Sequence, residues 1–224
     1  MSAGDIMGLG TLVKATHDGD ELEYSIGTHG EHHALNSLAV VAAMNSYGIE
    51  LEQYEQYLAD FRATAGRGQE KHYQLVGGRV LFVDESYNAN PLSMSATLGT
   101  LGKIFVQPNW PTPMVPRRIA IIGDMRELGE AADHLHRELR GPIQASKIDK
   151  VFACGPHMRA LWDVLPDNIR GAYAEKSEGL IAPLLAAIAP GDVIMIKGSL
   201  GTRMAPVVEA VKAHLAEWEK AGKQ

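Results

Sequence analysis

The stretch from Val83 to Pro91 holds the densest set of reactive and hydrogen-bonding groups in the chain: two carboxylates, a phenol, amides and a hydroxyl. It follows the apolar run Val80–Val83 and precedes a segment typical of a helix start. Ordinary strand-to-helix connections have about 2–6 residues, and ligands of open α/β sheets collect at the carboxyl ends of strands. The stretch therefore predicts a ligand-binding loop. The alternative is an Asn-rich turn, because Asn tolerates unusual backbone angles.

Three further polar segments could take part in binding. Gly66-Arg67-Gly68 places an arginine between glycines, where its forked donors either reach a phosphate or are solvated. Gly123–Gly129 and Lys197–Arg203 each follow an apolar strand, and the second of these combines lysine, hydroxyl and glycine before a helix, as anion sites do. It is not a Walker A motif, whose spacing the chain lacks. The segments that follow parallel strands are predicted to meet at one edge of the sheet.

A histidine-rich segment, Thr28–His33, lies further upstream. On a helix, His32 and Asn36 are four residues apart and share a face, which could hydrogen-bond a purine edge. Zinc is the second interpretation, disfavoured because the chain has a single cysteine and no matching cluster. Capping of the helix by exposed side chains is the third.

Composition excludes several classes of function. A formal charge of −6 over 224 residues offers no basic stripe for nucleic acid or an anionic membrane. The most apolar stretch, Leu180–Pro190, is about half the roughly 20 residues that a membrane span needs. Cys154, the single cysteine, permits no internal disulfide and is predicted to be a buried structural thiol. With no secretory signal at Met1–Gly10, this predicts a cytoplasmic protein.

Upstream of these loops the patterns predict two hairpins and two helices. Asp-Gly and Gly-Gly turns indicate the hairpins 12–26 and 72–83. Apolar periodicity indicates helices at 32–47 and 49–61, with Leu35 and Phe61 among the inward residues. Four prolines make residues 107–116 an extended linker.

After the linker, strands and helices alternate. Strands are expected at 118–122, 150–153 and 192–196, and helices at 130–140, 156–165, 177–189 (capped by Ser177) and 202–218. This alternation predicts an α/β fold with a doubly wound, mostly parallel, Rossmann-like C-terminal domain at 69–224. Residues 1–68 are predicted to be the remnant of a separate domain.

Several motifs, in order through nearly all of the chain, resemble one family. Asp84–Pro91 with Ser93-Met94 resembles the signature of the Mur ligases, and within them of the branch that adds D-alanyl-D-alanine. The other matching motifs are Gly30-x-His32-x-x-x-Asn36-x-Leu38-Ala39, Gly66-Arg67, Ile121–Gly129 followed by His136, and Lys197-Gly198-Ser199 with Met204. On this resemblance, residues 1–68 are similar to the end of an α/β ATP-binding domain, and 69–224 to the family's C-terminal domain.

The resemblance implies a monomeric, ATP-dependent amide ligase of peptidoglycan synthesis, and so of cell-wall growth, cell shape and division. ATP phosphorylates the carboxylate of UDP-N-acetylmuramoyl-tripeptide, and the amine of D-alanyl-D-alanine attacks the acyl phosphate. Mg²⁺ is held by the central domain. The implied nucleotide-binding residues are His32, Asn36, Arg67 and Glu85. The implied substrate-binding residues are Tyr87, Asn88, Asn90, Asp124, Arg126, Lys197 and Ser199.

The sequence departs from the family pattern in three places. His33 stands where many members have Asn, and Glu85 where several have Asp. The P-loop and the metal ligands are absent, so no catalytic residue is assigned and these residues alone are not expected to turn over ATP. Two alternatives remain: a folylpolyglutamate synthetase-like ligase, and a non-catalytic binding or regulatory module.

Overall fold

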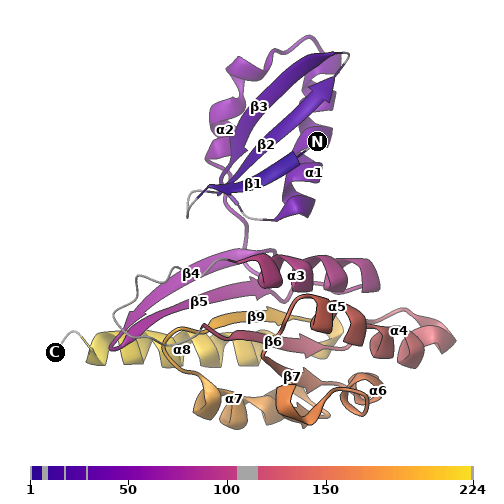
Figure 1. The fold of residues 1–224 in the computed structure, drawn as a ribbon, viewed down its shortest axis with the longest axis vertical. Helices are drawn as coiled ribbons and strands as arrows, with labels where there is room; N and C mark the ends of the chain where they lie inside the picture. Colours follow the sequence, from indigo (N-terminus) through magenta and orange to yellow (C-terminus); the bar gives the residue numbers. More distant parts are fainter. Residues whose placement is uncertain (1, 7–9, 18, 29, 105–115, 223–224) are drawn as a thin grey trace. The chain divides into compact units, whose positions relative to one another are not determined.

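The computed structural model describes residues 2–6, 10–17, 19–28, 30–104 and 116–222. The chain divides into two compact units, Met1–Thr64 and Ala65–Gln224 (Figure 1). The proline-rich segment predicted to be a linker lies outside the described residues except for Pro116.

The first unit combines a small antiparallel sheet with helices. Its strands lie in the order β1 (Ser2–Ile6), β2 (Gly10–His17), β3 (Asp20–Ile26). The helices are α1 (Glu31–Ser46), the 3-10 turn η1 (Leu51–Gln53) and α2 (Glu55–Ala59). The pairing of His17 with Asp20 confirms the first predicted hairpin, whereas β1 was not predicted.

Three expected core residues of this unit are exposed, and Ala42 of α1 is one of them. Leu35 is 52% exposed and Phe61 49%, while α1 buries Ala34 and Val41 instead. The prediction was wrong for α1 because residues 38–44 are apolar on every side of the helix, so periodicity does not single out one face. It was wrong for Phe61 because the expected helix is only two short pieces that end at Ala59.

The second unit is built on a six-stranded sheet. Its strand order is β4-β5-β9-β6-β7-β8, with β4 antiparallel to β5 and every other neighbouring pair parallel. This confirms the predicted doubly wound, mostly parallel fold. The strands are β4 (Gln69–Leu75), β5 (Gly78–Glu85), β6 (Arg118–Gly123), β7 (Lys150–Cys154), β8 (Arg170–Ala174) and β9 (Val193–Lys197). The edge strand β8 was missed because its side chains are only partly buried and lack the apolar run of a central strand.

The helices of this unit are more broken than expected. The long ones are α3 (Pro91–Lys103) and α8 (Ala205–Ala221), and the short ones are α4 (Ala132–Glu138), α5 (Arg140–Ala145), α6 (Met158–Trp162) and α7 (Ile181–Ala187). Single 3-10 turns are η2 (Gly129–Ala131), η3 (Asp167–Ile169), η4 (Ser177–Leu180) and η5 (Leu200–Thr202). Ser177 makes no capping bond. Its hydroxyl instead donates to the Arg203 carbonyl at 2.7 Å, so the predicted cap was wrong.

Both faces of the six-stranded sheet are covered. Because side chains alternate along a strand, Leu81 and Val83 of β5 join the core beneath α3, α4, α5 and α6. Val80 and Phe82 join the opposite core, beneath α7 and α8. Figure 1 shows helices on either side of the sheet. With both faces covered, the edge formed by the strand ends is the natural place for polar ligands.

Cys154 confirms the prediction of a buried thiol. Its Sγ lies 3.4 Å from Met204 Sδ, and burial raises the pKa of the thiol to about 12. None of the helices among the described residues combines the length and apolarity that a membrane crossing requires.

Candidate functional site

Three of the predicted polar segments meet at the carboxyl edge of the six-stranded sheet. Glu85 at the end of β5 pairs in register with Lys197 at the end of β9, which also pairs with Ile122 of β6. The loops after these parallel strands therefore lie side by side, as predicted. The structure adds how they are tied together.

Lys197 ties the end of β9 to the loop 84–91. The residue is only 3% exposed. Its ammonium donates to the Asn88 carbonyl at 3.0 Å and lies 3.3 Å from Glu85 Oε2. Burial lowers the pKa of Lys197, while the Glu85 carboxylate favours the charged form. Lys197 thus links β9 to the loop 84–91 through contacts within the protein.

Ser199 joins all three loops through one hydroxyl. Its Oγ donates to the Ala89 carbonyl at 3.1 Å and accepts the Arg126 amide at 3.0 Å. Its own amide donates to the Asp124 carbonyl at 3.1 Å. Ser199 is buried, so its hydroxyl holds the three loops together at this edge.

Asp124 joins the loop after β6 to the loop after β7. Its carboxylate, in a residue only 1% exposed, accepts the Met158 amide at 2.9 Å and the His157 amide at 3.4 Å at the start of α6. The same carboxylate lies against Gly155, whose φ of 112° and lack of a Cβ allow the close approach. The side chain therefore secures the loop after β7.

The loop 84–91 is itself rigidly hydrogen-bonded. Asp84 Oδ1 accepts both the amide and the hydroxyl of Ser86, at 3.2 and 2.6 Å. Asn88 Oδ1 accepts the Ala89 amide at 2.8 Å. Asn90 caps α3 in a reciprocal capping box with Ser93. The amides predicted to bind substrate thus also shape the turn, and Tyr87 is left projecting, 47% exposed.

Arg126 projects from this frame beside a cavity. Its guanidinium is exposed and donates to the Gly201 carbonyl at 3.1 Å. The cavity, of about 300 Å³, is lined by residues from the loops after β6, β7, β8 and β9. It is a hollow at the carboxyl edge of the sheet, where a small polar ligand fits.

Two acidic residues that line this cavity, Glu175 and Glu178, were not singled out from the sequence, whereas Arg203 ends the predicted polar segment Lys197–Arg203. Arg203 has a left-handed backbone, with φ of 54°, and lines the cavity together with the cationic residues Arg126 and Lys176. Glu175 and Glu178, from the segment after β8, supply carboxylates. The polar run Glu175–Glu178 directly follows a strand and could have indicated these carboxylates. It was overlooked because the strand β8 was not predicted. Cations and anions together suit a ligand with both charges.

His136 supports the loop that carries Asp124 and Arg126. The imidazole is fully buried, with Nε2 accepting the Met125 amide at 2.9 Å and Nδ1 donating to the Ala132 carbonyl at 2.6 Å. This arrangement requires the neutral ring. Burial lowers the pKa of His136 below its ordinary value of 6.5, although the Ala132 carbonyl and the Asp124 carboxylate oppose the shift.

Stability of the second unit should therefore fall with acid. Below pH 6.5 the unfolded chain takes up a proton that the folded His136 refuses, so unfolding is favoured by at most about 1.4 kcal/mol per pH unit until the folded-state pKa is reached. Urea unfolding at pH 7.5 and 5.5 measures the loss. His136→Gln should reduce this pH dependence, and His134→Gln, an exposed position on the same helix, should not. Equal pH dependence in His136→Gln and the wild type would contradict this account.

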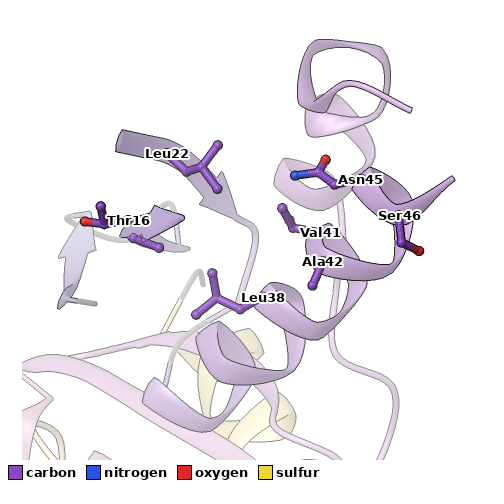
Figure 2. Close-up of a pocket in the computed structure, with 8 residues that line it drawn as sticks. Thr16, Leu22, Leu38, Val41, Ala42, Asn45 and Ser46 are labelled. Carbon is purple, nitrogen blue, oxygen red and sulfur yellow. The ribbon is translucent and has the colours of Figure 1, made fainter. Parts of the chain in front are cut away.

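The structure says less about the nucleotide-binding residues that were predicted in the first unit. Asn36 is exposed on α1, and the side chain of His32 lies outside the described residues. An open hollow of about 520 Å³ lies between the β2–β3 hairpin and α1, with Leu22 and Leu38 on opposite sides (Figure 2). None of the predicted site residues lines it. Among the described residues no group of three His, Cys, Asp or Glu side chains could hold a metal ion.

The mostly parallel sheet, with helices on both faces and polar loops gathered at the carboxyl edge, defines a doubly wound α/β domain. The family model described as Mur ligase, glutamate ligase domain, matches residues 66–200. The chain belongs to the Mur ligase family.

Curated relatives carry a more specific name. The chain is 31% identical over 178 residues to the UDP-N-acetylmuramoyl-tripeptide–D-alanyl-D-alanine ligase of Rickettsia prowazekii, covering 80% of this chain and 37% of the relative. The ligase of the same name from Escherichia coli is 31% identical over 185 residues, covering 82% and 37%. The chain thus spans well under half the length of these relatives.

Solved structures agree on the fold. The MurF ligase of Thermotoga maritima, determined in complex with ADP, superposes with a TM-score of 0.77 at 21% identity, over 97% of this chain and 46% of that one. MurF of Acinetobacter baumannii gives a TM-score of 0.74 at 22% identity, over 92% and 42%. At such identities the likeness establishes the fold.

Proposed function

We propose that the chain forms part of an ATP-dependent ligase that adds D-alanyl-D-alanine to UDP-N-acetylmuramoyl-tripeptide in cytoplasmic peptidoglycan synthesis. One observation carries this: buried Lys197, Ser199 and Asp124 lock three loops into one surface at the carboxyl edge of the sheet. Exposed arginines are left projecting from it. A preorganised polar surface of this kind suits a reaction that depends on positioning and charge.

The cavity at this edge matches a free dipeptide. D-alanyl-D-alanine carries a carboxylate at one end and an ammonium at the other, and its side chains are only methyl groups. Arg126 and Arg203 line the cavity and would serve as carboxylate partners, while Glu175 and Glu178, also in the lining, would serve as ammonium partners. The volume of about 300 Å³ is of the order needed for a small ligand. We infer that this cavity receives the amine substrate.

The phosphates and ribose of the nucleotide are assigned to the neighbouring part of the same surface of the second unit. Arg67 is exposed, and no carboxylate in the described part of the chain pairs with it, so its donors suit the phosphates of ATP. Glu85, at the end of β5, is assigned to the ribose hydroxyls. Asn36 and His32, which belong to the first unit, are separately assigned to adenine on the family resemblance. The described residues offer no cluster for Mg²⁺, whose ligands would come from elsewhere.

The chemistry requires few groups from this chain. ATP transfers its γ-phosphoryl to the tripeptide carboxylate. The amine nitrogen then bonds to the acyl carbon as the carbon–oxygen bond to phosphate breaks, and the amine proton is lost. The residues here would orient the amine and keep water from the acyl phosphate. Because the P-loop sequence is absent from these 224 residues, we expect no ATP turnover from them alone. Mg²⁺-dependent ADP release would contradict that expectation.

Calorimetric titration of the chain with D-alanyl-D-alanine tests the proposal. Converting the dipeptide carboxylate to an amide should weaken binding about tenfold, the value of one charge-assisted hydrogen bond. Arg126→Gln should do the same, and in that variant the amide should cost little more. Arg140→Gln, an exposed arginine on α5, is the matched control and should change nothing. Equal affinity for the acid and the amide would overturn the proposal.

A further inference from the structure

Arg67 and Tyr87 form a stacked pair that joins two loops of the second unit. The guanidinium carbon lies 3.9 Å from the centroid of the Tyr87 ring. Both side chains are largely exposed, so neither is buried for the sake of the core. At exposed sites such a contact is worth a modest but measurable amount.

The backbone brings the two residues together independently of the stack. The Tyr87 amide donates to the Gly66 carbonyl at 2.9 Å, and the Gly68 amide donates to the Asp84 carbonyl at 2.9 Å. Gly66 has φ of 74°, and a Cβ there would lie 3.1 Å from both Cβ and N of Tyr87. Glycine is therefore needed for the loop to approach this closely.

The backbone before and after Tyr87 is also held in place by side chains. Asp84 binds Ser86 just before Tyr87, and Lys197 binds the carbonyl of Asn88 just after it. Tyr87 thus stands on a fixed piece of backbone, and the long Arg67 side chain lies on its ring. A stacked guanidinium keeps the N–H groups at its edge available for an anion.

We propose that Tyr87 is a positioning residue for Arg67: it holds the guanidinium in one orientation for the phosphates of the nucleotide. This rests on the proposed function, which gives Arg67 those phosphates. It differs from the role expected for Tyr87 from the sequence, that of contacting the peptide substrates. Immobilising a free arginine costs side-chain entropy on binding, and a prior stack removes part of that cost.

The first test needs no ligand. In the purified chain, the Arg67 Nε–Hε resonance, assigned by its loss in Arg67→Lys, should be shifted by the ring current of Tyr87. Tyr87→Phe should keep the shift and Tyr87→Leu should abolish it. The Tyr87 amide bond to Gly66 is retained in both variants because it comes from the backbone. An unchanged resonance in Tyr87→Leu would overturn the proposal.

The second test is ADP affinity, measured by calorimetry on the same proteins. Tyr87→Leu should weaken binding about threefold to fivefold, whereas Tyr87→Phe should stay within about twofold of the wild type. In an Arg67→Ala background Tyr87→Leu should have no further effect. Leu92→Ala, an exposed residue at the start of α3, is the control for general disturbance of this surface.

The outcomes separate the two hypotheses. If wild-type protein binds ADP and Tyr87→Leu binds it equally well, the positioning role is wrong and the proposed nucleotide site stands. If the wild type binds no ADP, the nucleotide assignment of Arg67 fails, and the role of Tyr87 fails with it. Equal losses in Tyr87→Phe and Tyr87→Leu would assign the effect to the hydroxyl, against the stack.

Discussion

Asp124→Ala is expected to lower the free energy of unfolding of the second unit by about 3 kcal/mol. The substitution leaves the amides of Met158 and His157 without their buried acceptor, and each such group costs about 1–3 kcal/mol. It also opens a void beside Gly155. Urea unfolding followed by tryptophan fluorescence measures the loss, because residues 1–64 contain no tryptophan and Trp162 and Trp218 lie on α6 and α8 of the second unit.

Asp167→Ala is the matched control for Asp124. Its side chain is 93% exposed, where its ion pair with Arg170 contributes little. We expect a change within about 0.5 kcal/mol there. A loss of less than about 1 kcal/mol in Asp124→Ala would show that the carboxylate is not the structural link described here.

Lys197→Met is expected to cost a similar amount and to loosen the loop 84–91. It removes the ammonium that lies against the Glu85 carboxylate, whose side chain is 12% exposed, and removes a donor from the Asn88 carbonyl. Removing one partner of a buried ion pair typically costs about 3–5 kcal/mol, so we expect roughly 3 kcal/mol for this partly buried pair. Amide hydrogen exchange at Asn88 and Ala89 should quicken in the variant.

Lys176→Met tests whether loss of any lysine at this edge would act in the same way. Lys176 lines the cavity at the carboxyl edge and is exposed, so its removal should leave stability and loop exchange unchanged. If Lys197→Met were as stable as the wild type, with slow exchange in the loop, the tie between β9 and the loop would be unimportant. The rigid surface would then need another cause.

The sequence carried the architecture of the second unit well. Apolar runs at 118–122, 150–153 and 192–196 predicted β6, β7 and β9, because strands buried on both faces leave an unmistakable pattern. Edge strand β8 lacks that pattern. Helix lengths were overestimated because apolar spacing persists through 3-10 turns such as η4, which precedes α7.

The sequence predicted where the candidate site lies, but not which residues within it contact one another. Polar residues after β5, β6 and β9 were predicted to share one edge, since parallel strands end together. Lys197, Ser199 and Asp124 are buried and link loops through contacts between segments up to 112 residues apart, as between Lys197 and Glu85. Periodicity in one segment contains no information on such contacts. The stack of Arg67 on Tyr87 was beyond prediction for the same reason.

Amide chemical-shift mapping with D-alanyl-D-alanine tests the central claim most directly. On addition of the dipeptide at millimolar concentration, the account predicts shifts confined to residues 124–126, 155, 175–178 and 201–203, which surround the cavity at the carboxyl edge. L-alanyl-L-alanine, with the same charges and the opposite stereochemistry, should shift them less. Shifts in the hollow between α1 and the β2–β3 hairpin, or equal responses to the two dipeptides, would contradict the assignment of this edge as the amine-substrate site.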